Sequence, residues 1–267
     1  MSEETFDRLD VFDRVDESDE SQQLIAFLAW ADAKPDVIAR RSRSYELLAI
    51  RPGALVADIG CGIGTVLADL IEHGARAVGV DSSEAMVRDA ARRVPDAELH
   101  VADAAALPLE DGVLSGYRAE RVYQHLADPM PALGEAMRVL EPGGRIVLVD
   151  QDWDAFVVDG DDRQTTRSML RGFADSLPNG WAGRRNGLAL AASGFVDVAV
   201  EGETVTRIDY DYAAPVLPAL KAAAVSAGAV EEEVATAWLE EQRRRGEEGR
   251  FFAAMTHFLA SATRPPI

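Results

Sequence analysis

Short apolar runs alternate with amphipathic stretches between about residue 54 and residue 200. The runs that predict strands are Ala54–Ile59, Ala77–Asp81, Glu98–Val101, Leu114–Tyr117, Arg145–Asp150 and Phe195–Val200. All but the third and fourth are continuously apolar, which is typical of strands buried on both faces of a parallel sheet. The stretches that predict helices are Thr65–His73, Ser83–Arg93, Met130–Leu140 and Asp162–Asp175. This alternation predicts an α/β fold with a doubly wound sheet.

The two ends of the chain do not follow this alternation of strands and helices. Residues 1–50 predict an N-terminal helical cap, whose first apolar cluster is Leu24, Ile25, Phe27 and Leu28. After residue 200, strands are predicted at Val205–Tyr212 and Phe251–Ala262, and helices at Pro215–Ala227 and Glu231–Gly246. We therefore expect a Rossmann-like, seven-stranded core over 51–212 and 247–267. Residues 213–246 are expected to form a helical lid inserted before the last strand.

Charge and composition exclude several classes of partner. The net charge of −19 disfavours nucleic acid and anionic lipid, because both need a concentrated positive surface. The single cysteine, Cys61, permits neither a disulfide framework nor a thiolate metal cluster within one chain. No apolar run approaches the roughly 20 residues that span a bilayer, and the acidic N-terminus does not resemble a secretory signal. The sequence therefore predicts a cytoplasmic protein with a small-molecule substrate, and it leaves a homodimer open.

A glycine-rich turn is the strongest chemical signal in the chain. A buried strand runs through Asp58 into Gly60, Gly62 and Gly64, and a helix is predicted to start at Thr65. Such a turn brings backbone N–H groups and a helix N-terminus to a ligand at the carboxyl end of the sheet. Dinucleotide-binding loops have a third glycine where this chain has Thr65. The carboxylate of Asp58 would repel a pyrophosphate but suits a ligand with an ammonium group.

Two further strand ends carry carboxylates. Asp81 ends the strand after the glycine turn and is placed to accept both hydroxyls of a ribose. Ser82 and Ser83 follow it as candidate helix caps, and Met86 lies one turn into the next helix. Asp103 follows the third strand by two residues, where it can accept a hydrogen bond from an adenine amino group. In this order the residues predict a nucleoside site.

These residues resemble the class I S-adenosylmethionine-dependent methyltransferases. The resemblance covers Asp58 to Gly64, Asp81, Asp103-Ala104 and the run Arg138 to Gly144, within about residues 45 to 200. It is greatest to the branch that contains the ubiquinone and menaquinone biosynthesis enzymes and many natural-product methyltransferases. The resemblance implies S-adenosylmethionine as the cofactor, S-adenosylhomocysteine as its product, and methyl transfer to oxygen, nitrogen or carbon of a small molecule.

The resemblance also implies how the glycine turn contacts this cofactor. The resemblance implies that the backbone of four residues approaches the methionine part and the ribose of the cofactor: Gly60, Cys61, Gly62 and Ile63. Asp58 is implied to lie near the ammonium group.

The adenosine contacts are implied on the next two strand ends. Asp81 binds the ribose hydroxyls, with Ser82 and Met86 along the adenosine. Asp103 and Ala104 contact the adenine. Glu120 is implied to border the methionine part, and Arg43, which lies outside the firm motifs, to pair with the cofactor carboxylate. The helical insert has no counterpart in the simplest members of the family, which leaves the substrate open.

Two residues are candidates for the chemistry. His125 follows the fourth strand and is our first candidate for a general base, although a histidine there can equally pack against the next helix. Asp152 follows the fifth strand beside Trp153 and is a candidate base or cation-binding group, with a capping acidic turn as the alternative. We expect His257 to be structural and expect no metal site.

The same residues are compatible with functions other than methyl transfer. A relative that binds the cofactor but catalyses a rearrangement or cyclisation would keep the same motifs. A nicotinamide-dependent oxidoreductase is disfavoured, because Thr65 replaces the glycine and no Tyr-x-x-x-Lys pair is present. A non-enzymatic ligand sensor has only the acidic helix Glu231–Gly246 in its favour, and such charges usually form a solvated face.

Overall fold

The computed structural model describes residue 26 and residues 29–266. The predicted apolar cluster at Leu24, Ile25, Phe27 and Leu28 lies outside these residues. No helix in the described part of the chain is both long and apolar enough to cross a lipid bilayer.

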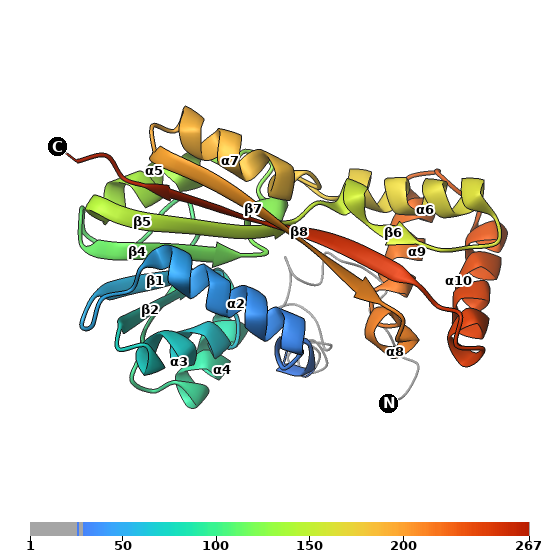
Figure 1. Ribbon diagram of the computed structural model, residues 1–267, viewed down its shortest axis with the longest axis horizontal. Coiled ribbons are helices and arrows are strands. Elements are labelled where there is room, and N and C mark those ends of the chain that lie inside the picture. The colour runs from blue at the N-terminus through green and yellow to red at the C-terminus, as the bar shows by residue number, and fades with distance from the viewer. Residues whose placement is uncertain (1–25, 27–28, 267) are drawn as a thin grey trace.

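Five parallel strands form the first part of a single sheet (Figure 1). They are β1 (Leu55–Ile59), β2 (Arg76–Asp81), β3 (Glu98–Val101), β4 (Leu114–Glu120) and β5 (Leu140–Gln151). Their order in the sheet is β3-β2-β1-β4-β5, so the order reverses beside β1. A reversal of this kind leaves a crevice at the carboxyl ends of the strands, where α/β folds bind ligands.

A long antiparallel ribbon completes the sheet. β8 (Ala253–Thr263) lies between β5 and β7 (Val196–Arg207) and is antiparallel to both. Past the end of β5, β8 pairs instead with the two-residue strand β6 (Val157–Val158). The ribbon of β7 and β8 therefore extends beyond the carboxyl ends of the parallel strands, as Figure 1 shows.

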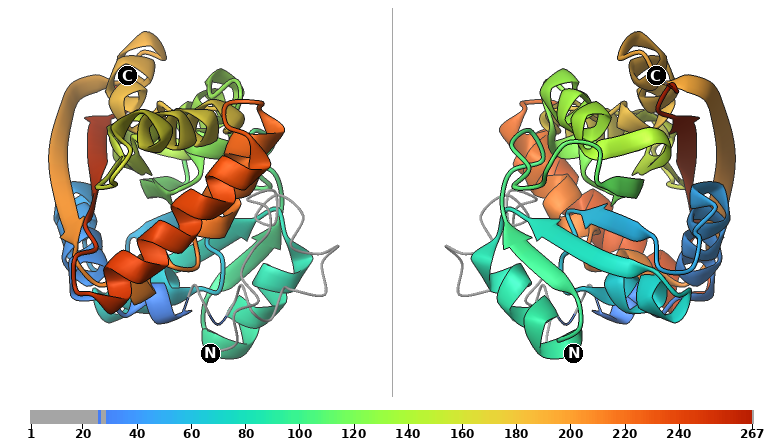
Figure 2. Two further views of the ribbon diagram at one scale, coloured as in Figure 1. Left: turned by 90° about the vertical axis from the view of Figure 1, so that its right-hand side faces the viewer. Right: turned by 90° about the vertical axis from the view of Figure 1, so that its left-hand side faces the viewer.

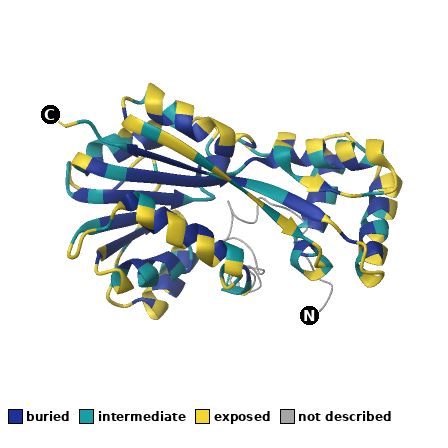
Figure 3. Ribbon diagram, in the orientation of Figure 1, coloured by how far each residue is buried: buried dark blue, intermediate teal, exposed yellow. Residues whose placement is uncertain are grey.

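Helices cover both faces of the sheet. One apolar cluster joins the sheet to α2 (Pro35–Leu48), α3 (Thr65–Glu72) and the end of α4 (Glu84–Arg93). A second cluster joins the opposite face to α5 (Met130–Val139) and α7 (Ala182–Ala192). Between them, most of β4 and residues 146–150 of β5 are buried, and Figure 3 shows these parts largely in dark blue. Burial on both faces explains the continuous apolar runs of these strands.

Four helices form a separate distal lobe beyond the carboxyl ends of the strands (Figures 1 and 2). They are α6 (Arg163–Ser176), α8 (Tyr210–Ala213), α9 (Leu217–Ser226) and α10 (Glu232–Glu247). Met169, Phe173, Leu217, Leu220 and Trp238 are fully or nearly buried in their common core. The distal lobe thus has its own hydrophobic core, which packs against the far end of β8.

The predicted fold class is confirmed, with local differences. The sheet has eight strands rather than seven, because β6 is an additional two-residue strand. The predicted strand Val205–Tyr212 is wrong in its second half, since β7 ends at Arg207 and Tyr210–Ala213 is helical. The division into cap, core and 213–246 lid stays a prediction, to which the structure adds α6 as a packing partner of α9.

Candidate functional site

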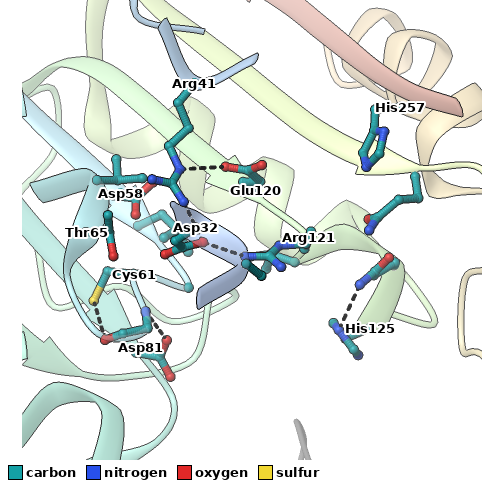
Figure 4. Close-up of a pocket in the computed structure, with 18 of the residues that line it drawn as sticks. Asp32, Arg41, Asp58, Cys61, Thr65, Asp81, Glu120, Arg121, His125 and His257 are labelled. Carbon is teal, nitrogen blue, oxygen red and sulfur yellow. Dashed lines mark hydrogen bonds and ion pairs between the residues drawn. The ribbon is translucent and has the colours of Figure 1, made fainter. Parts of the chain in front are cut away.

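A cavity of about 510 Å³ lies between the carboxyl ends of the parallel strands and the distal lobe. Its walls come from the turns after β1, β2, β3 and β4, from the β7–β8 ribbon, and from α8 and the start of α9. Most of the predicted cofactor-binding residues line it: Asp58, Gly60, Cys61, Gly62, Ile63, Asp81, Ser82, Met86, Asp103, Ala104 and Glu120. Figure 4 shows several of them around the cavity.

The glycine turn follows β1 and is fixed by the neighbouring strand β2. The backbone N–H groups of Gly60 and Cys61 both donate to the carbonyl of Val80, at 2.7 and 3.1 Å. Gly60 has φ +68°, and a Cβ there would lie 2.3 Å from Val122 Cγ2. Gly62 has φ +50°, but a Cβ there would meet no atom within 4 Å. The turn therefore packs tightly against the protein at Gly60 and leaves open space at Gly62.

Asp81 joins the glycine turn to the start of α4. Its Oδ2 accepts a hydrogen bond from Gly62 N at 2.8 Å, and its Oδ1 accepts one from Ser83 N at 2.9 Å. Ser83 Oγ in turn accepts from Met86 N at 3.2 Å and caps α4. These bonds fix the Asp81 carboxylate at the cavity wall, with Ser82 and Met86 beside it.

The third strand end also reaches the cavity. Asp103 and Ala104 line it, and Asp103 Oδ1 accepts a hydrogen bond from Ala105 N at 2.7 Å. The three successive strand ends therefore place Asp58, Asp81 and Asp103 around one end of the same cavity.

A fully buried arginine joins two of the predicted carboxylates. Arg118 in β4 donates to Asp58 at 2.9 Å, to Glu120 at 2.5 Å, and to Ser44 Oγ of α2 at 2.8 Å. Burial raises the pKa of Asp58 to about 6 against the opposing effect of Arg118. Burial would raise the pKa of Glu120 as well, but the surrounding guanidinium groups, led by Arg118, hold it well below its ordinary value. Glu120 is therefore an anion at neutral pH.

Arg118 belongs to a continuous network of ion pairs, most of whose members line the cavity. Each member lies within 4.0 Å of an oppositely charged member. The arginines are Arg40, Arg41, Arg118, Arg121 and Arg207, and the carboxylates are Asp32, Asp36, Asp58, Glu120 and Glu203. We call these ten residues the charge network. It is balanced in formal charge, and Figure 4 shows its centre around Arg41, Asp32, Glu120 and Arg121.

Arg121 is held in an unusual backbone conformation within this network. Its φ is +59°, a region that non-glycine residues enter rarely and mostly at functional positions. Its backbone N–H donates to Val149 O at 2.8 Å, and its guanidinium lies 3.5 Å from Asp32. The side chain lines the cavity. The sequence analysis did not predict Arg121 as a site residue, because backbone strain leaves no compositional signal.

Two predicted site residues do not line the cavity. Arg43 lies on the outside of α2, where its guanidinium pairs with Glu201 and Glu46 at 2.5 Å each. Arg41, two residues earlier, faces the cavity instead. Asp152 is buried, and both of its carboxylate oxygens accept hydrogen bonds from Arg184. The structure therefore supports neither Arg43 as a cofactor ligand nor Asp152 as a base.

His125 lines the cavity in a short 3-10 turn, Tyr123–His125. Its Nε2 lies 3.1 Å from Gln124 Nε2, while Gln124 Oε1 accepts from Trp153 Nε1 at 2.8 Å. Because an indole N–H only donates, the Gln124 amide must present its NH₂ group to His125. The Nε2 lone pair of His125 is thus already engaged, and its role as a base stays a prediction.

The part of the cavity beyond His125 is mostly apolar. We call it the acceptor lobe: Trp153, Phe156, Leu177, Val205, Tyr212, Val216, Leu217, Ala253, Met255 and His257, with Gln151 and Arg207. The ring centroid of Tyr212 lies 5.3 Å from that of Trp30. Tyr212 is also stacked under the Arg207 guanidinium at 4.0 Å.

Known proteins resemble this chain in sequence. Residues 57–148 match a family model described as "Methyltransferase domain". An uncharacterized 37.1 kDa protein in transposon TN4556 of Streptomyces fradiae is 37% identical over 239 residues, which are 84% of this chain and 68% of that protein. The demethylmenaquinone methyltransferase of Beutenbergia cavernae is 34% identical over 110 residues, 41% of this chain and 46% of that enzyme, so the match spans less than half of that relative.

A solved structure shares the fold. Phosphoethanolamine N-methyltransferase 2 of Haemonchus contortus, in complex with phosphomonomethylethanolamine and S-adenosylhomocysteine, superposes with a TM-score of 0.62 at 15% identity. The superposition covers 95% of this chain and 60% of that one. The fold, the glycine turn with its strand-end carboxylates, and the sequence matches agree. The chain belongs to the class I S-adenosylmethionine-dependent methyltransferases.

Proposed function

We propose that this protein transfers the methyl group of S-adenosylmethionine to a small-molecule acceptor with an apolar body. One observation carries the proposal: a single cavity contains both the glycine turn with Asp81 and the apolar acceptor lobe. A donor nucleoside and an acceptor held in one cavity can be aligned for an in-line displacement, and their binding displaces water from it.

The residues at the glycine turn fit S-adenosylmethionine. Gly62 leaves space where any side chain would project, which suits close approach of a ligand to its backbone. Asp81 offers a fixed carboxylate for the ribose hydroxyls, and Asp103 lies at the next strand end for the adenine. When bound, S-adenosylmethionine supplies a methyl group on a positively charged sulfur, and this charge activates the leaving group.

The charge network suits the amino-acid end of the same cofactor. A zwitterion needs an anion for its ammonium group and a cation for its carboxylate. Glu120 and Arg41 both line the cavity and lie 3.9 Å apart at their nearest charged atoms. Arg41 Nε is buried without a hydrogen-bond partner among the described residues, so it can donate to a ligand carboxylate. We propose Arg41 for the role that the sequence assigned to Arg43.

The acceptor lobe favours an apolar small molecule. Trp153, Phe156, Met255 and Leu217 give it large apolar walls, and a pocket of this kind binds an apolar body with few polar contacts. A quinol or a related natural product fits such a lobe, in keeping with the demethylmenaquinone methyltransferase relative. Action in the cytoplasm, a homodimer and the absence of nucleic-acid partners stay predictions.

The direct test combines binding with turnover. Purified protein is incubated with S-adenosylmethionine carrying a labelled methyl group and with a panel of hydroquinones, phenols and terpenoid alcohols, and both S-adenosylhomocysteine and labelled product are measured. The proposal expects both to form in equal amounts with at least one apolar acceptor. Tight cofactor binding without label transfer to any acceptor would instead favour a relative that catalyses a rearrangement or cyclisation.

A further inference from the structure

One polar pair interrupts the apolar wall of the acceptor lobe. Gln151 at the end of β5 and His257 in β8 are direct partners in the antiparallel register, so their side chains share one face of the sheet. Met255 and Ala253 follow on the same face of β8 at alternate positions. All four residues line the cavity. Gln151 and His257 therefore form part of the acceptor lobe's wall, and His257 lies near Arg40, Glu120, Arg121 and Arg207 of the charge network.

Both side chains have buried polar atoms that the protein does not satisfy. Gln151 Oε1 and His257 Nδ1 have no hydrogen-bond partner among the described residues, and His257 is only 8% exposed. Burying such atoms unpaired is costly, so in native proteins they usually meet a ligand or an ordered water. Because both residues line one cavity and are partners in the strand register, we infer that a single polar group of a ligand can meet both atoms.

The chemistry of the two atoms specifies that group. An amide oxygen only accepts hydrogen bonds, while a neutral imidazole donates at one ring nitrogen and accepts at the other. A hydroxyl can donate to Gln151 Oε1 and accept from His257 at the same time. A carbonyl or carboxylate would leave Gln151 Oε1 unpaired. The guanidinium groups of Arg40, Arg121 and Arg207 near His257 disfavour an ammonium group.

The charges around His257 point to an acidic hydroxyl. Burial first, and then the guanidinium groups of Arg40, Arg121 and Arg207, lower the pKa of His257 to about 3 against the opposing effect of Glu120. Glu203, directly opposite His257 on β7, is paired with Arg40 at 3.6 Å, and Asp36 with Arg207 at 2.5 Å. The imidazole is thus neutral at physiological pH. The arginines favour partial negative charge on an oxygen beside it.

We propose that Gln151 and His257 recognise an acidic hydroxyl, that of a phenol, hydroquinone or enol, on the acceptor of this methyltransferase. The proposal rests on the proposed function and adds the substrate class and the two residues that select it. The apolar body of the acceptor lies along Met255 and Trp153 toward the distal lobe. Gln151 and His257 lie outside residues 57–148, the segment that matches the methyltransferase family model, so that match does not account for them.

A chromogenic pair of probes tests the recognition without turnover. 4-Nitrophenol carries an acidic hydroxyl, and 4-nitroanisole is the same molecule with that oxygen methylated. Binding of each is measured calorimetrically to the full-length protein, with and without saturating S-adenosylhomocysteine. We expect 4-nitrophenol to bind at least roughly tenfold more tightly, because a site built to hydrogen-bond a hydroxyl discriminates against its loss.

Substitutions of Gln151 and His257 test whether these two residues cause the preference for 4-nitrophenol over 4-nitroanisole. Gln151→Leu and His257→Leu are each expected to abolish the preference for 4-nitrophenol while 4-nitroanisole binds as before. Gln151→Asn and His257→Gln keep polar groups and are expected to retain part of it. His100→Leu, on β3 away from the cavity, is the control and is expected to change neither affinity.

The outcomes separate this inference from the proposed function. Equal binding of the two probes, or a preference unchanged in both leucine variants, would overturn the hydroxyl-recognition pair even if S-adenosylhomocysteine binds tightly. Failure of S-adenosylhomocysteine to bind would overturn the proposed function, whereas the probe comparison without cofactor would still decide the pair. Circular dichroism and the unchanged affinity for 4-nitroanisole verify that each leucine variant is folded.

Discussion

Asp58 and Arg118 lie directly opposite one another on the adjacent parallel strands β1 and β4, and Arg118 Nη1 donates to Asp58 Oδ1 at 2.9 Å. Both residues are buried, and Arg118 also holds Glu120. The pair therefore couples the strand that leads into the glycine turn to the carboxylate at the end of β4. Through Ser44, Arg118 further ties both strands to α2.

Replacing Arg118 tests whether this coupling maintains the site. Arg118→Met leaves two buried carboxylates without their main partner, which in other proteins costs about 3–5 kcal/mol of unfolding free energy. Arg118→Lys keeps the charge but lacks the planar guanidinium with several donors, so we expect an intermediate loss. Urea denaturation measures both.

An exposed arginine provides the control for that series. Arg51 pairs with Glu141 at the surface, and Arg51→Met is expected to change stability by less than about 1 kcal/mol. If Arg118→Met proved as stable as the wild type, the buried pair would have no structural importance.

Gly60→Ala is expected to damage the glycine turn. The new Cβ would adopt an unfavourable positive φ and would lie 2.3 Å from Val122 Cγ2. We expect a loss of at least about 2 kcal/mol from backbone strain and overpacking together. Gly134→Ala in α5 is the matched control: it meets no atom within 4 Å and is expected to leave stability unchanged or raise it by up to about 1 kcal/mol. Equal effects of the two alanines on thermal unfolding would refute the packing argument.

Tyr212 is expected to slow the escape of bound cofactor. Its ring contacts both Trp30 and the Arg207 guanidinium, and so joins α8 to the segment before α2 and to β7. Tyr212→Ala removes both contacts, each worth roughly 1 kcal/mol, and should speed dissociation of S-adenosylhomocysteine about tenfold in stopped-flow measurements. Tyr212→Phe keeps the ring and should stay within about threefold of the wild type. Unchanged dissociation from Tyr212→Ala would show that this stack does not gate the cavity.

The buried, neutral His257 predicts a pH dependence of stability. Its pKa is about 3 in the folded protein, below the 6.5 of an exposed histidine, so the unfolded chain binds the extra proton as pH falls below 6.5. Stability that this residue contributes is therefore present above pH 6.5 and lost toward pH 3. Between pH 7 and pH 5 the loss attributable to His257 is about 2 kcal/mol.

His257→Gln isolates this effect from other titrating groups. The variant should lose about 2 kcal/mol less than the wild type over the same interval in urea denaturation, whereas His100→Gln should follow the wild type. Parallel pH profiles for wild type and His257→Gln would indicate that the imidazole titrates normally.

Much of the sheet and the nucleoside end of the cavity could be predicted from sequence. Apolar runs mark strands buried on both faces, and the glycines and strand-end carboxylates at Asp81 and Asp103 are local signals. The structure brings these residues to one cavity because the carboxyl ends of parallel strands share one edge.

The rest depends on contacts distant in sequence. The predicted fourth strand ends at Tyr117, whereas β4 continues through Arg118 to Glu120. Arg118 is a charged residue that is buried by partners 60 and 74 residues away. Arg41 and Arg43 have similar sequence surroundings, and only the rotation of α2 decides which faces the cavity. The pairing of Gln151 with His257 depends on the register of β5 and β8, which no local pattern specifies.

The central claim is that Asp81 and the glycine turn form the binding site for S-adenosylmethionine. The most direct measurement is calorimetric titration of S-adenosylhomocysteine into the wild type, Asp81→Ala and the exposed control Asp96→Ala. We predict saturable one-to-one binding to the wild type and to Asp96→Ala, and at least roughly tenfold weaker binding to a folded Asp81→Ala, which is a loss of about 1.4 kcal/mol or more. Equal affinity of Asp81→Ala and the wild type, or no binding to the wild type, would contradict the account.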